Sequence, residues 1–395
     1  FFFQAEDVIR DSVASRGRGD VYKRQNLLML SGDTSVVRGN RRAFHNTLSE
    51  FSNYWNRIDV LTYKVAGVNR HDCFDNVIFH PSPWRKVMQP VFIWKKGHAL
   101  AEKRHYDLIV SHDYGFFLHG IGARWLSQSS GVPHVNEIHH VDGYPRGANL
   151  RERLQPSVTR WFVRSAISSS LGFRITNQGE LEPLLRSWGV PAAQILLLYS
   201  LYLDFDVFHP EDTCMEYDAI FVGRLTSNKA PFLFLKGIAD LARRRDGVRS
   251  LMIGSGPLKA RIRARAAALG LASNVEFRDW VSEPFELADL YRRSRCLICT
   301  SFSEGGPRVV AEALGCGVPV VSTKVGLARE LVQDGVNGFL VDWSADDIAA
   351  RIEQLIVDPD LRARMALTAP RSVQRFEKSR VLREYALGYQ NMVQS

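Results

Sequence analysis

Short apolar runs alternate with longer amphipathic stretches along the chain from Asn26 onward. That alternation is typical of βα units, which place consecutive strands side by side in a parallel sheet. Helical periodicity is clearest at 116–128 and 150–168. We therefore expect the first half to form one doubly wound domain with strands at 26–31, 58–63, 107–111, 133–138, 172–176 and 195–199.

A second series of the same kind begins near Tyr217. Its apolar runs predict strands at 218–223, 250–254, 274–277, 296–300, 319–323 and 338–341. A polar break at 210–213 (PEDT) marks the connection between the two series. We therefore expect two domains, 26–205 and 206–370, followed by a basic amphipathic helix over 371–395 that packs back toward the first domain.

Length and composition are those of a soluble two-domain protein. The chain has 395 residues, which is more than one hydrophobic core usually holds, and 45% of them are hydrophobic. No apolar run reaches the roughly 18 residues that a membrane-spanning helix needs. Five cysteines form an odd and sparse set. They argue against a disulfide scaffold and favour a reducing compartment, the cytoplasm.

The first 25 residues do not read like the start of a domain. Three phenylalanines are followed closely by Glu6 and Asp7, so we expect no secretory signal in this segment. The string closely resembles translated sequencing-adapter DNA of the kind found at the ends of metagenome-derived proteins. A short amphipathic helix at 4–13 is the alternative. We expect residues 1–25 to be a non-native artefact and exclude them from the fold.

Positive charge is concentrated in the first half of the chain. The formal net charge is +9, and residues 26–200 hold 20 Lys and Arg against 13 Asp and Glu. A basic surface suits an anionic membrane, a phosphorylated substrate or nucleic acid. The sequence has neither zinc-finger spacing nor an RNA-binding aromatic motif, so nucleic acid is not expected as a partner.

The strongest candidate site is the segment 301–323, SFSEGGPRVVAEALGCGVPVVST. Glu304 ends a predicted strand, and Gly305–Gly306–Pro307 forms a tight turn from which a helix starts. Glycine lets a ligand approach the backbone closely, and proline is favoured in the first turn of a helix. The free N–H groups and the dipole of such a helix end attract phosphate. Glu312 lies inside the helix, where it can face a pair of hydroxyl groups.

This segment resembles the retaining glycosyltransferases of family 4, which have the GT-B fold. Their hallmark is a pair of glutamates in the setting E-G-x-P-x-x-x-x-E-A-x-x-x-G-x-P-V-V, which residues 304–321 match. The resemblance covers about 217–370 and implies two Rossmann-like domains facing each other across a cleft. It implies that Glu304 binds the hydroxyls of the donor sugar and Glu312 those of the ribose. The alternative is a generic Rossmann turn with surface carboxylates.

The strand-loop FVGRLTSNKA (221–230) also matches the family. Its arginine and lysine, which grip the donor diphosphate in the family, correspond to Arg224 and Lys229. Fixed cations at this place stabilise the charge that grows on the leaving phosphate. The glycine that usually follows the lysine is replaced by Ala230 in this chain.

The next loops of the second half keep the order of the family. Gly254 and Gly256 of IGSGP allow tight backbone passage near the nucleotide. The segment 278–294 resembles the one whose backbone reads the base, near Val281. The amides of Gly305 and Gly306 are expected to help hold the diphosphate.

The first half matches more loosely, as expected of an acceptor domain. In the loop 31–44 the family places a glycine near the donor phosphate, and Gly39 is the candidate. VNEIHHVDGYP (135–145) resembles the strand end where the family has a histidine beside the reacting sugar. His139 fits this role best and His140 next.

Other chemistry-bearing positions have competing interpretations. His112 and Asp113 follow another strand, where they line the same cleft or make structural loop contacts. The D-x-D at 204–206 resembles a metal-binding motif, but it lies in the linker and offers too few oxygen ligands. Cys296 and Cys299 form a C-x-x-C inside a predicted buried strand without a second pair, which favours core packing over zinc.

The sequence as a whole predicts a retaining glycosyltransferase that moves a sugar from a UDP- or GDP-sugar to a glycan or lipid-linked acceptor, in cell-surface polysaccharide or glycoconjugate synthesis. No metal or cofactor is expected. The protein is expected in the cytoplasm of a bacterium, with peripheral contact to anionic membrane. A phosphorylase or an epimerase on the same scaffold is one rival. A catalytically silent sugar-nucleotide-binding subunit is the other, and the presence of Glu304, Arg224 and Lys229 argues against it.

Overall fold

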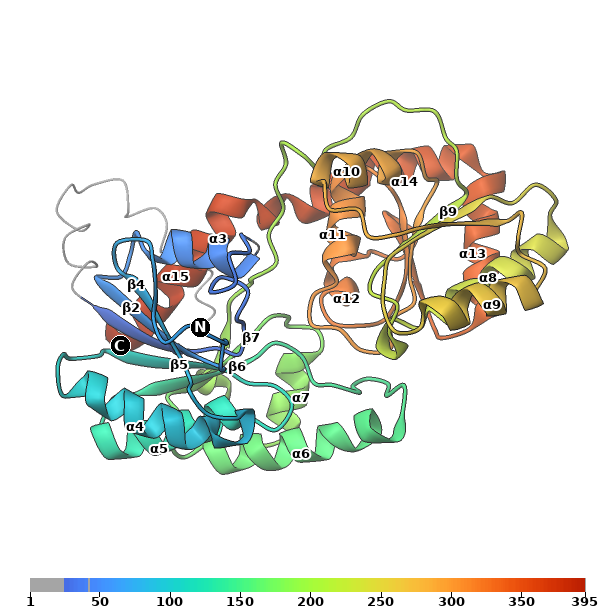
Figure 1. Ribbon diagram of the computed structural model, residues 1–395. Coiled ribbons are helices and arrows are strands. Elements are labelled where there is room, and N and C mark those ends of the chain that lie inside the picture. The colour runs from blue at the N-terminus through green and yellow to red at the C-terminus, as the bar shows by residue number, and fades with distance from the viewer. Residues whose placement is uncertain (1–24, 42, 395) are drawn as a thin grey trace.

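The computed structural model describes residues 25–41 and 43–394, so the segment assigned to an artefact lies, apart from Gln25, outside the described residues. The described chain forms two α/β domains, each built on its own sheet (Figure 1). The first sheet ends at Leu197 and the second begins at Ala219. The predicted boundary at 205/206 falls between them. The prediction of two doubly wound domains is confirmed.

Within the described residues, the first sheet has eight strands in the order β3-β4-β2-β1-β5-β6-β7-β8. They are β1 (Asn26–Leu30), β2 (Arg57–Thr62), β3 (His71–Cys73), β4 (Val77–Pro81), β5 (Leu108–His112), β6 (His134–Ile138), β7 (Gly172–Ile175) and β8 (Ile195–Leu197). Strand β3 runs antiparallel to β4, and the other neighbours are parallel. The six strands predicted from apolar runs are present. The pattern misses β3 and β4, whose short sequences are interrupted by His and Asp.

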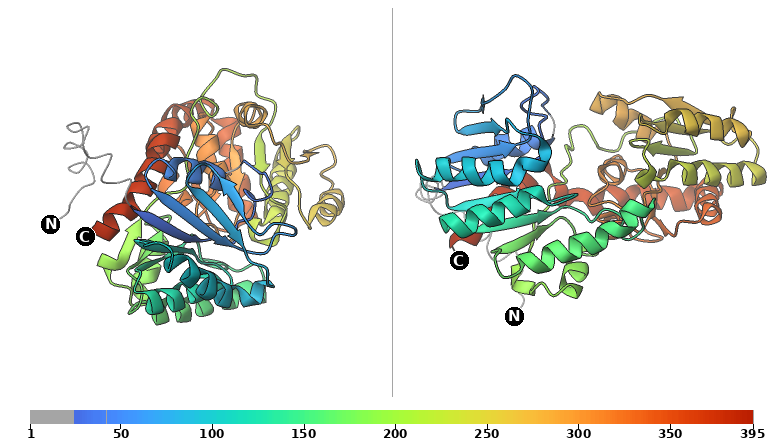
Figure 2. Two further views of the ribbon diagram at one scale, coloured as in Figure 1. Left: turned by 60° about the vertical axis from the view of Figure 1, so that its left-hand side comes forward. Right: turned by 60° about the horizontal axis from the view of Figure 1, so that its bottom comes forward.

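Helices cover both faces of the first sheet. They are α3 (Ala43–Phe51), α4 (Gln89–Ala101), α5 (Leu118–Ser130), α6 (Leu150–Ala166), α7 (Leu181–Ser187) and, from the end of the chain, α15 (Lys378–Gln394), with 3-10 turns at Lys86–Met88 and Ala192–Gln194. Strand β1 shows why two layers form, because its side chains alternate between the faces. Leu27 and Met29 pack in the cluster that includes α3 and α15, whereas Leu28 and Leu30 pack with α4 and α5. Helices α4, α5 and α6 form one layer on that second side (Figure 2).

In the part of the chain that the structure describes, the second sheet has six parallel strands in the order β11-β10-β9-β12-β13-β14. They are β9 (Ala219–Val222), β10 (Ser250–Ile253), β11 (Val275–Arg278), β12 (Leu297–Cys299), β13 (Val320–Thr323) and β14 (Gly338–Val341). All six coincide with predicted strands. Their helices are α8 (Pro231–Arg244), α9 (Lys259–Ala268), α10 (Pro284–Arg292), α11 (Arg308–Gly315), α12 (Ala328–Leu331), α13 (Ala345–Val357) and α14 (Pro359–Val373), with a 3-10 turn at Ser227–Lys229. No helix of the described chain has both the length and the apolar character needed to cross a membrane.

Two segments cross between the domains and run side by side. One is the connection 198–218, and the other is the 3-10 turn Gln374–Phe376 between α14 and α15. The backbone N–H of Leu203 donates to the carbonyl of Phe376 at 2.6 Å. Beyond this turn α15 lies against α3, so the end of the chain returns to the first domain (Figure 1). The sequence pattern predicts one helix from 371 onward, whereas the structure begins it at Lys378.

One buried histidine makes the stability of the first domain depend on pH. His134 opens β6, is fully buried, and has no hydrogen-bond partner for either ring nitrogen among the described residues. Burial and the nearby charge of Arg124 lower its pKa to about 4. The unfolded chain takes up a proton near pH 6.5, before the folded chain does. Stability is therefore lost as the pH falls from 6.5 toward 4.

We expect His134→Leu to remove this loss. Between pH 7 and pH 5 the variant should gain about 2 kcal/mol of unfolding free energy relative to the wild type, because one pKa unit corresponds to about 1.4 kcal/mol. Urea unfolding at the two pH values measures it. His105→Leu is the control, because the His105 side chain is 80% exposed. If both variants change with pH as the wild type does, the account of His134 is wrong.

Candidate functional site

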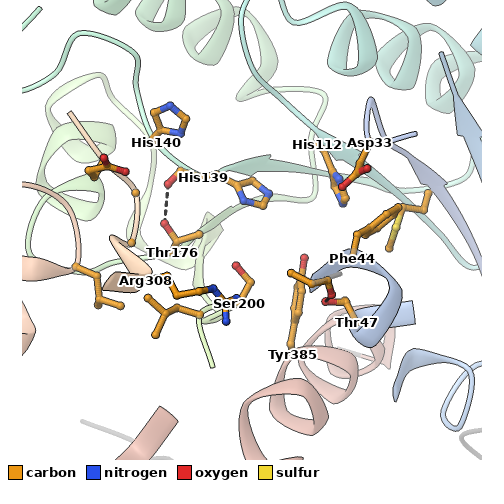
Figure 3. A pocket seen from close by; sticks show the side chains of 17 residues that line it. Asp33, Phe44, Thr47, His112, His139, His140, Thr176, Ser200, Arg308 and Tyr385 are labelled. Carbon is orange, nitrogen blue, oxygen red and sulfur yellow. Dashed lines mark hydrogen bonds between the residues drawn. The ribbon is translucent and has the colours of Figure 1, made fainter. Parts of the chain in front are cut away.

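A cavity of about 390 Å³ lies between the two domains, with walls from both. It sits at the carboxyl ends of parallel strands, which is where doubly wound sheets bind ligands. The first domain contributes α3 and the ends of β5 and β6, the second contributes the turn after β12, and the linker and α15 close the remaining side (Figure 3). Its polar lining consists of Asp33, Thr47, His112, His139, His140, Thr176, Ser200, Glu304, Arg308 and Tyr385.

His139 projects into this cavity from the end of β6. Its ring points toward His112, whereas the His140 ring lies at the edge (Figure 3). The ring nitrogen Nε2 of His139 lies 2.7 Å from Oε2 of Glu137, and the backbone carbonyl accepts a hydrogen bond of 2.7 Å from Oγ1 of Thr176. The Glu137 carboxylate therefore orients the His139 ring, and Thr176, which directly follows β7, holds the His139 backbone.

Glu137 is fully buried under the cavity floor. Burial would raise its pKa, but His112, Arg174 and His139 outweigh that effect and hold the pKa well below its usual value. Nε2 of His112 lies 3.2 Å from the carboxylate, and Nη1 of Arg174 lies 3.7 Å away. Burial in turn lowers the pKa of His112 to about 4, against the attraction of Glu137. Near neutral pH, where His112 is uncharged, the charge of Arg174 and the hydrogen bond with His139 keep the Glu137 carboxylate ionised.

The C-terminal helix completes this cluster. The hydroxyl groups of Tyr385 and Tyr389 both donate to Oε1 of Glu137. These tyrosines stand four residues apart and so share one face of α15. The guanidinium of Arg174 lies 4.3 Å from the centre of the Tyr385 ring. Tyr385 also lines the cavity, so the last helix of the chain contributes directly to the wall of the site.

On the opposite wall, Glu304 forms an ion pair with Lys229. The hydroxyl of Ser301 also donates to Oε1 of Glu304, at 2.9 Å. Both partners are largely buried, with 13% of the Glu304 side chain and 19% of the Lys229 side chain exposed. The structure thus brings together two residues that the sequence assigns to the sugar and to the diphosphate.

The backbones of the two domains meet at Gly305. A Cβ added there would lie 2.1 Å from the carbonyl oxygen of His139, so this position has no room for a side chain. The Gly305 carbonyl accepts a hydrogen bond of 3.0 Å from the side chain of Asn177. Gly306 also lines the cavity, and Pro307 directly precedes α11. The sequence-predicted turn therefore faces His139 across the cleft.

The loop that carries Arg224 and Lys229 ends in a strained residue. Ala230 has φ 46° and ψ 49°, a left-handed conformation that costs an L-residue about 1–2 kcal/mol. The hydroxyl of Thr300 holds the turn by donating to the carbonyls of Lys229 and Ala230, at 2.9 and 3.1 Å. Arg224 is exposed, forms no ion pair with a described residue, and does not line the cavity.

Other predicted donor residues lie behind this wall. Glu312 is buried in α11, where it accepts a hydrogen bond of 3.0 Å from the Tyr291 hydroxyl, and burial raises its pKa. A Cβ at Gly254 would lie 1.9 Å from the Gly223 carbonyl, so the loops after β9 and β10 are packed backbone to backbone. Gly256 makes the same close approach to Leu225. Val281 lies half-buried beside the core of this domain.

Two predicted positions, Gly39 and Asp113, lie away from the cavity, and a third, His140, lies at its edge. Gly39 is exposed in a turn with φ 81° and is not a lining residue. Asp113 is buried, accepting hydrogen bonds from Ser111 and Asn136 at 2.8 and 2.6 Å, and it does not line the cavity. His140 lines the edge and pairs with Asp142 at 2.8 Å.

The D-x-D at 204–206 and the C-x-x-C at 296–299 have structural roles. Oδ1 of Asp204 accepts from the N–H of Asp206 at 3.2 Å, inside the linker turn. Cys296 and Cys299 are buried at β12. The part of the chain that the structure describes contains no group of three or more side chains able to hold a metal ion.

Two sets of contacts join the first domain to α12 and to the loop before it, at the edge of the cleft. The N–H groups of Gln178 and Gly179 donate to Oε1 of Glu330 at 2.7 and 2.9 Å. In return, Oε2 of Glu180 accepts from the N–H of Gly326 at 3.0 Å and lies 3.3 Å from Nε of Arg329. At this edge of the cleft, a carboxylate of each domain therefore accepts hydrogen bonds from backbone N–H groups of the other domain.

Sequence reasoning missed Glu137, Tyr385 and Arg308. Glu137 was detectable, because it stands two residues before His139 and alternate strand residues share a face. The i,i+4 spacing of Tyr385 and Tyr389 predicts a shared helix face. Nothing in the sequence says which strand that face meets.

Comparisons with known proteins agree with this architecture. Residues 210–371 match the family described as glycosyl transferases group 1, and residues 59–199 match the glycosyl transferase 4-like domain. The D-inositol 3-phosphate glycosyltransferase of Acidothermus cellulolyticus is 30% identical over 302 residues. That alignment covers 71% of this chain and 66% of the relative, so the chain spans just under two thirds of the relative's length.

Solved structures give the same fold. Sucrose-phosphate synthase from Thermosynechococcus elongatus superimposes with a TM-score of 0.75 at 19% identity, covering 93% of this chain and 99% of the other. HepE of Anabaena, in complex with UDP and glucose, gives a TM-score of 0.70 at 20% identity over 92% and 99%. With its two matching family domains and this shared architecture, the chain belongs to the group 1 glycosyltransferases of the GT-B fold.

Proposed function

We propose that this protein is a retaining glycosyltransferase that moves a sugar from a UDP- or GDP-sugar to a glycan or lipid-linked acceptor. One observation carries the proposal: His139 and the Glu304–Gly306 turn face each other across one interdomain cavity. The Acidothermus relative is named as a glycosyltransferase, and HepE was solved with UDP and glucose, which supports the donor class.

On the donor side, Lys229, Arg224 and the amides of Gly305 and Gly306 hold the diphosphate. Glu304, which lines the cavity, holds the Lys229 ammonium in an ion pair. When the donor binds, the ammonium turns to the β-phosphate and the carboxylate is released to the hydroxyls of the sugar. Charge that is already in place lowers the barrier without reorganisation at the moment of reaction.

The remaining donor residues surround the nucleoside. Glu312 accepts hydrogen bonds from the ribose hydroxyls, and the backbone at Val281 contacts the base. Gly254 and Gly256 keep side chains out of the loops beneath the phosphates. Pro307 presets the start of α11, whose N–H groups point toward the diphosphate. Gly39 lets the first βα loop turn, with φ 81°, outside the lining of the cavity.

The transfer takes place on one face of the sugar. The bond from the anomeric carbon to the β-phosphate oxygen breaks, and the acceptor hydroxyl oxygen bonds to the same face. The hydroxyl proton passes to the departing phosphate. His139, oriented by Glu137, positions the acceptor hydroxyl or the donor sugar by a hydrogen bond.

We place this activity in the bacterial cytoplasm, in the synthesis of cell-surface polysaccharide or glycoconjugate, with peripheral contact to the inner face of the membrane. The basic first half supports that contact. The nucleotide-sugar serves as substrate, and no separate cofactor takes part.

Substitutions on the donor side and at His139 should separate binding of the diphosphate from positioning of the reacting groups. Arg224→Ala or Lys229→Ala should each raise the transfer barrier by roughly 2–4 kcal/mol and weaken UDP binding, because both lose phosphate contacts. His139→Ala should lower turnover about 100-fold while UDP binding stays unchanged. Calorimetry with UDP and initial rates with UDP-sugars measure the contrast.

Arg245→Ala, at the exposed position directly after α8, is the matched control and should leave both quantities unchanged. Normal turnover in folded Arg224→Ala and Lys229→Ala proteins would show that the diphosphate lies elsewhere.

Metal independence gives a separate prediction. Fixed cations at the diphosphate take the place of a divalent ion, so transfer should continue at an undiminished rate in excess chelator. The rate is compared with and without EDTA, and then after addition of magnesium or manganese. Complete loss in EDTA that either ion restores would contradict this mechanism.

A further inference from the structure

Helix α6 exposes a stripe of large apolar side chains. Leu150, Leu154, Val158 and Trp161 are 73%, 58%, 38% and 69% exposed. Their spacing of four, four and three residues places them on one side of the helix. Scattered single apolar residues are normal on a surface, but an aligned group marks an interaction site.

The stripe is not the side of α6 that packs on the core of the domain, because the opposite side of the helix is already buried there. Thr159, Phe162, Val163 and Ala166 are buried, and the Phe162 ring stacks on Phe117 at 4.3 Å between ring centres. The orientation of the helix is therefore fixed by packing, and the stripe faces outward.

Exposed arginines flank the stripe; they are Arg151, Arg153, Arg160 and Arg164. None of the four forms an ion pair with any residue that the structure describes. The carboxylate of α6, Glu152, is engaged at the helix start, where it accepts from the N–H of Ala148 at 2.8 Å. The outward face of α6 therefore combines apolar side chains with arginines that form no ion pair with the described residues, the composition of a helix that lies in a membrane interface.

The neighbouring helices α4 and α5 also expose large apolar side chains next to basic residues. Helices α4, α5 and α6 form one layer on the same side of the first sheet (Figure 2). Trp94 on α4 and Trp125 on α5 are exposed, and each is followed or preceded by a basic residue, Lys95 and Arg124. Tryptophan favours the membrane–water interface, where its ring is half in an apolar environment.

We propose that this α6 patch, the four apolar residues and the four arginines, docks the protein on an anionic lipid surface. The inference rests on the proposed function, because it supplies the place where a lipid-linked acceptor is held. A second copy fits the patch poorly, since an isologous contact would set four arginines against four arginines. Anionic lipid satisfies both components of the patch at once.

The position of the patch suits that role. The segment that leads from His139 into α6 carries Arg146, whose guanidinium lies 5.1 Å from the Phe302 ring and 5.4 Å from the Trp343 ring of the second domain. The start of α6 therefore adjoins the interdomain cleft. A lipid held at α6 therefore lies near a contact between the two domains rather than on a remote face.

Vesicle sedimentation of the full chain tests the proposal. Vesicles of phosphatidylcholine alone are compared with vesicles that contain phosphatidylglycerol, at low and high salt. We expect binding to the anionic vesicles that weakens with salt, because the Debye length falls from about 10 Å at 0.1 M to about 3 Å at 1 M. Arg160→Ala with Arg164→Ala should weaken binding by roughly 25-fold, and Leu154→Ser with Trp161→Ser by at least about tenfold.

Arg263→Ala with Arg265→Ala on α9 is the charge-matched control, since both residues are exposed on a helix of the second domain. The control should sediment with vesicles as the wild type does. UDP affinity and the melting temperature, measured without vesicles, should be unchanged in all variants.

Equal sedimentation of the wild type with both kinds of vesicle, or wild-type binding by the α6 variants, would overturn the proposal. So would concentration-dependent self-association lost in the α6 variants without any vesicle binding, which would assign the patch to a second copy. Vesicle binding by a protein that neither binds UDP nor transfers sugar would instead refute the proposed function and leave the docking surface intact.

Discussion

The buried carboxylate of Glu137 is the interaction on which the rest of the site depends. Two tyrosines of α15, Arg174 and two histidines converge on it beneath the cavity floor. A buried charge is tolerated only when it is paired, and removing one partner of such a pair costs about 3–5 kcal/mol. The chain therefore has to bring its C-terminal helix back to the first domain to stabilise the carboxylate that orients His139. The packing of the C-terminal helix onto the first domain therefore also completes the site.

The second constraint is the close approach of the two domains. Gly305 packs on the carbonyl of His139, and reciprocal contacts of Glu180 and Glu330 secure the edge of the cleft. Burial raises the pKa of Glu180 to about 7, against its hydrogen bond from Gly326 and the charge of Arg329. These contacts involve main-chain groups on both sides, so they set the spacing of the walls without depending on the donor or acceptor.

Much of this architecture follows from local sequence. Continuous apolar runs predicted twelve strands because parallel strands are buried on both faces. The block at 304–321 placed Glu312 correctly on α11. The prediction that Glu304 ends a strand is wrong, because β12 ends at Cys299 and Glu304 lies in the loop that follows it. The strands β3 and β4 were missed because His71, Asp72 and His80 break the apolar pattern.

Contacts between distant segments could not be predicted in this way. The pairing of Tyr385 with Glu137 joins residues 248 positions apart, and a helix face does not specify its partner. The Lys229–Glu304 ion pair likewise depends on how two loops of one sheet edge meet. The left-handed conformation of Ala230 could not be predicted from the sequence, because glycine is the residue that normally indicates such a position.

A double-mutant cycle on Tyr385→Phe and His139→Ala tests the central claim most directly, with kcat for sugar transfer as the readout. If α15 acts on the reaction through Glu137 and His139, the loss caused by Tyr385→Phe should largely disappear once His139 is absent. A coupling of about 1 kcal/mol or more is the predicted result. Additive losses, with Tyr385→Phe costing as much in the His139→Ala background as in the wild type, would contradict the account.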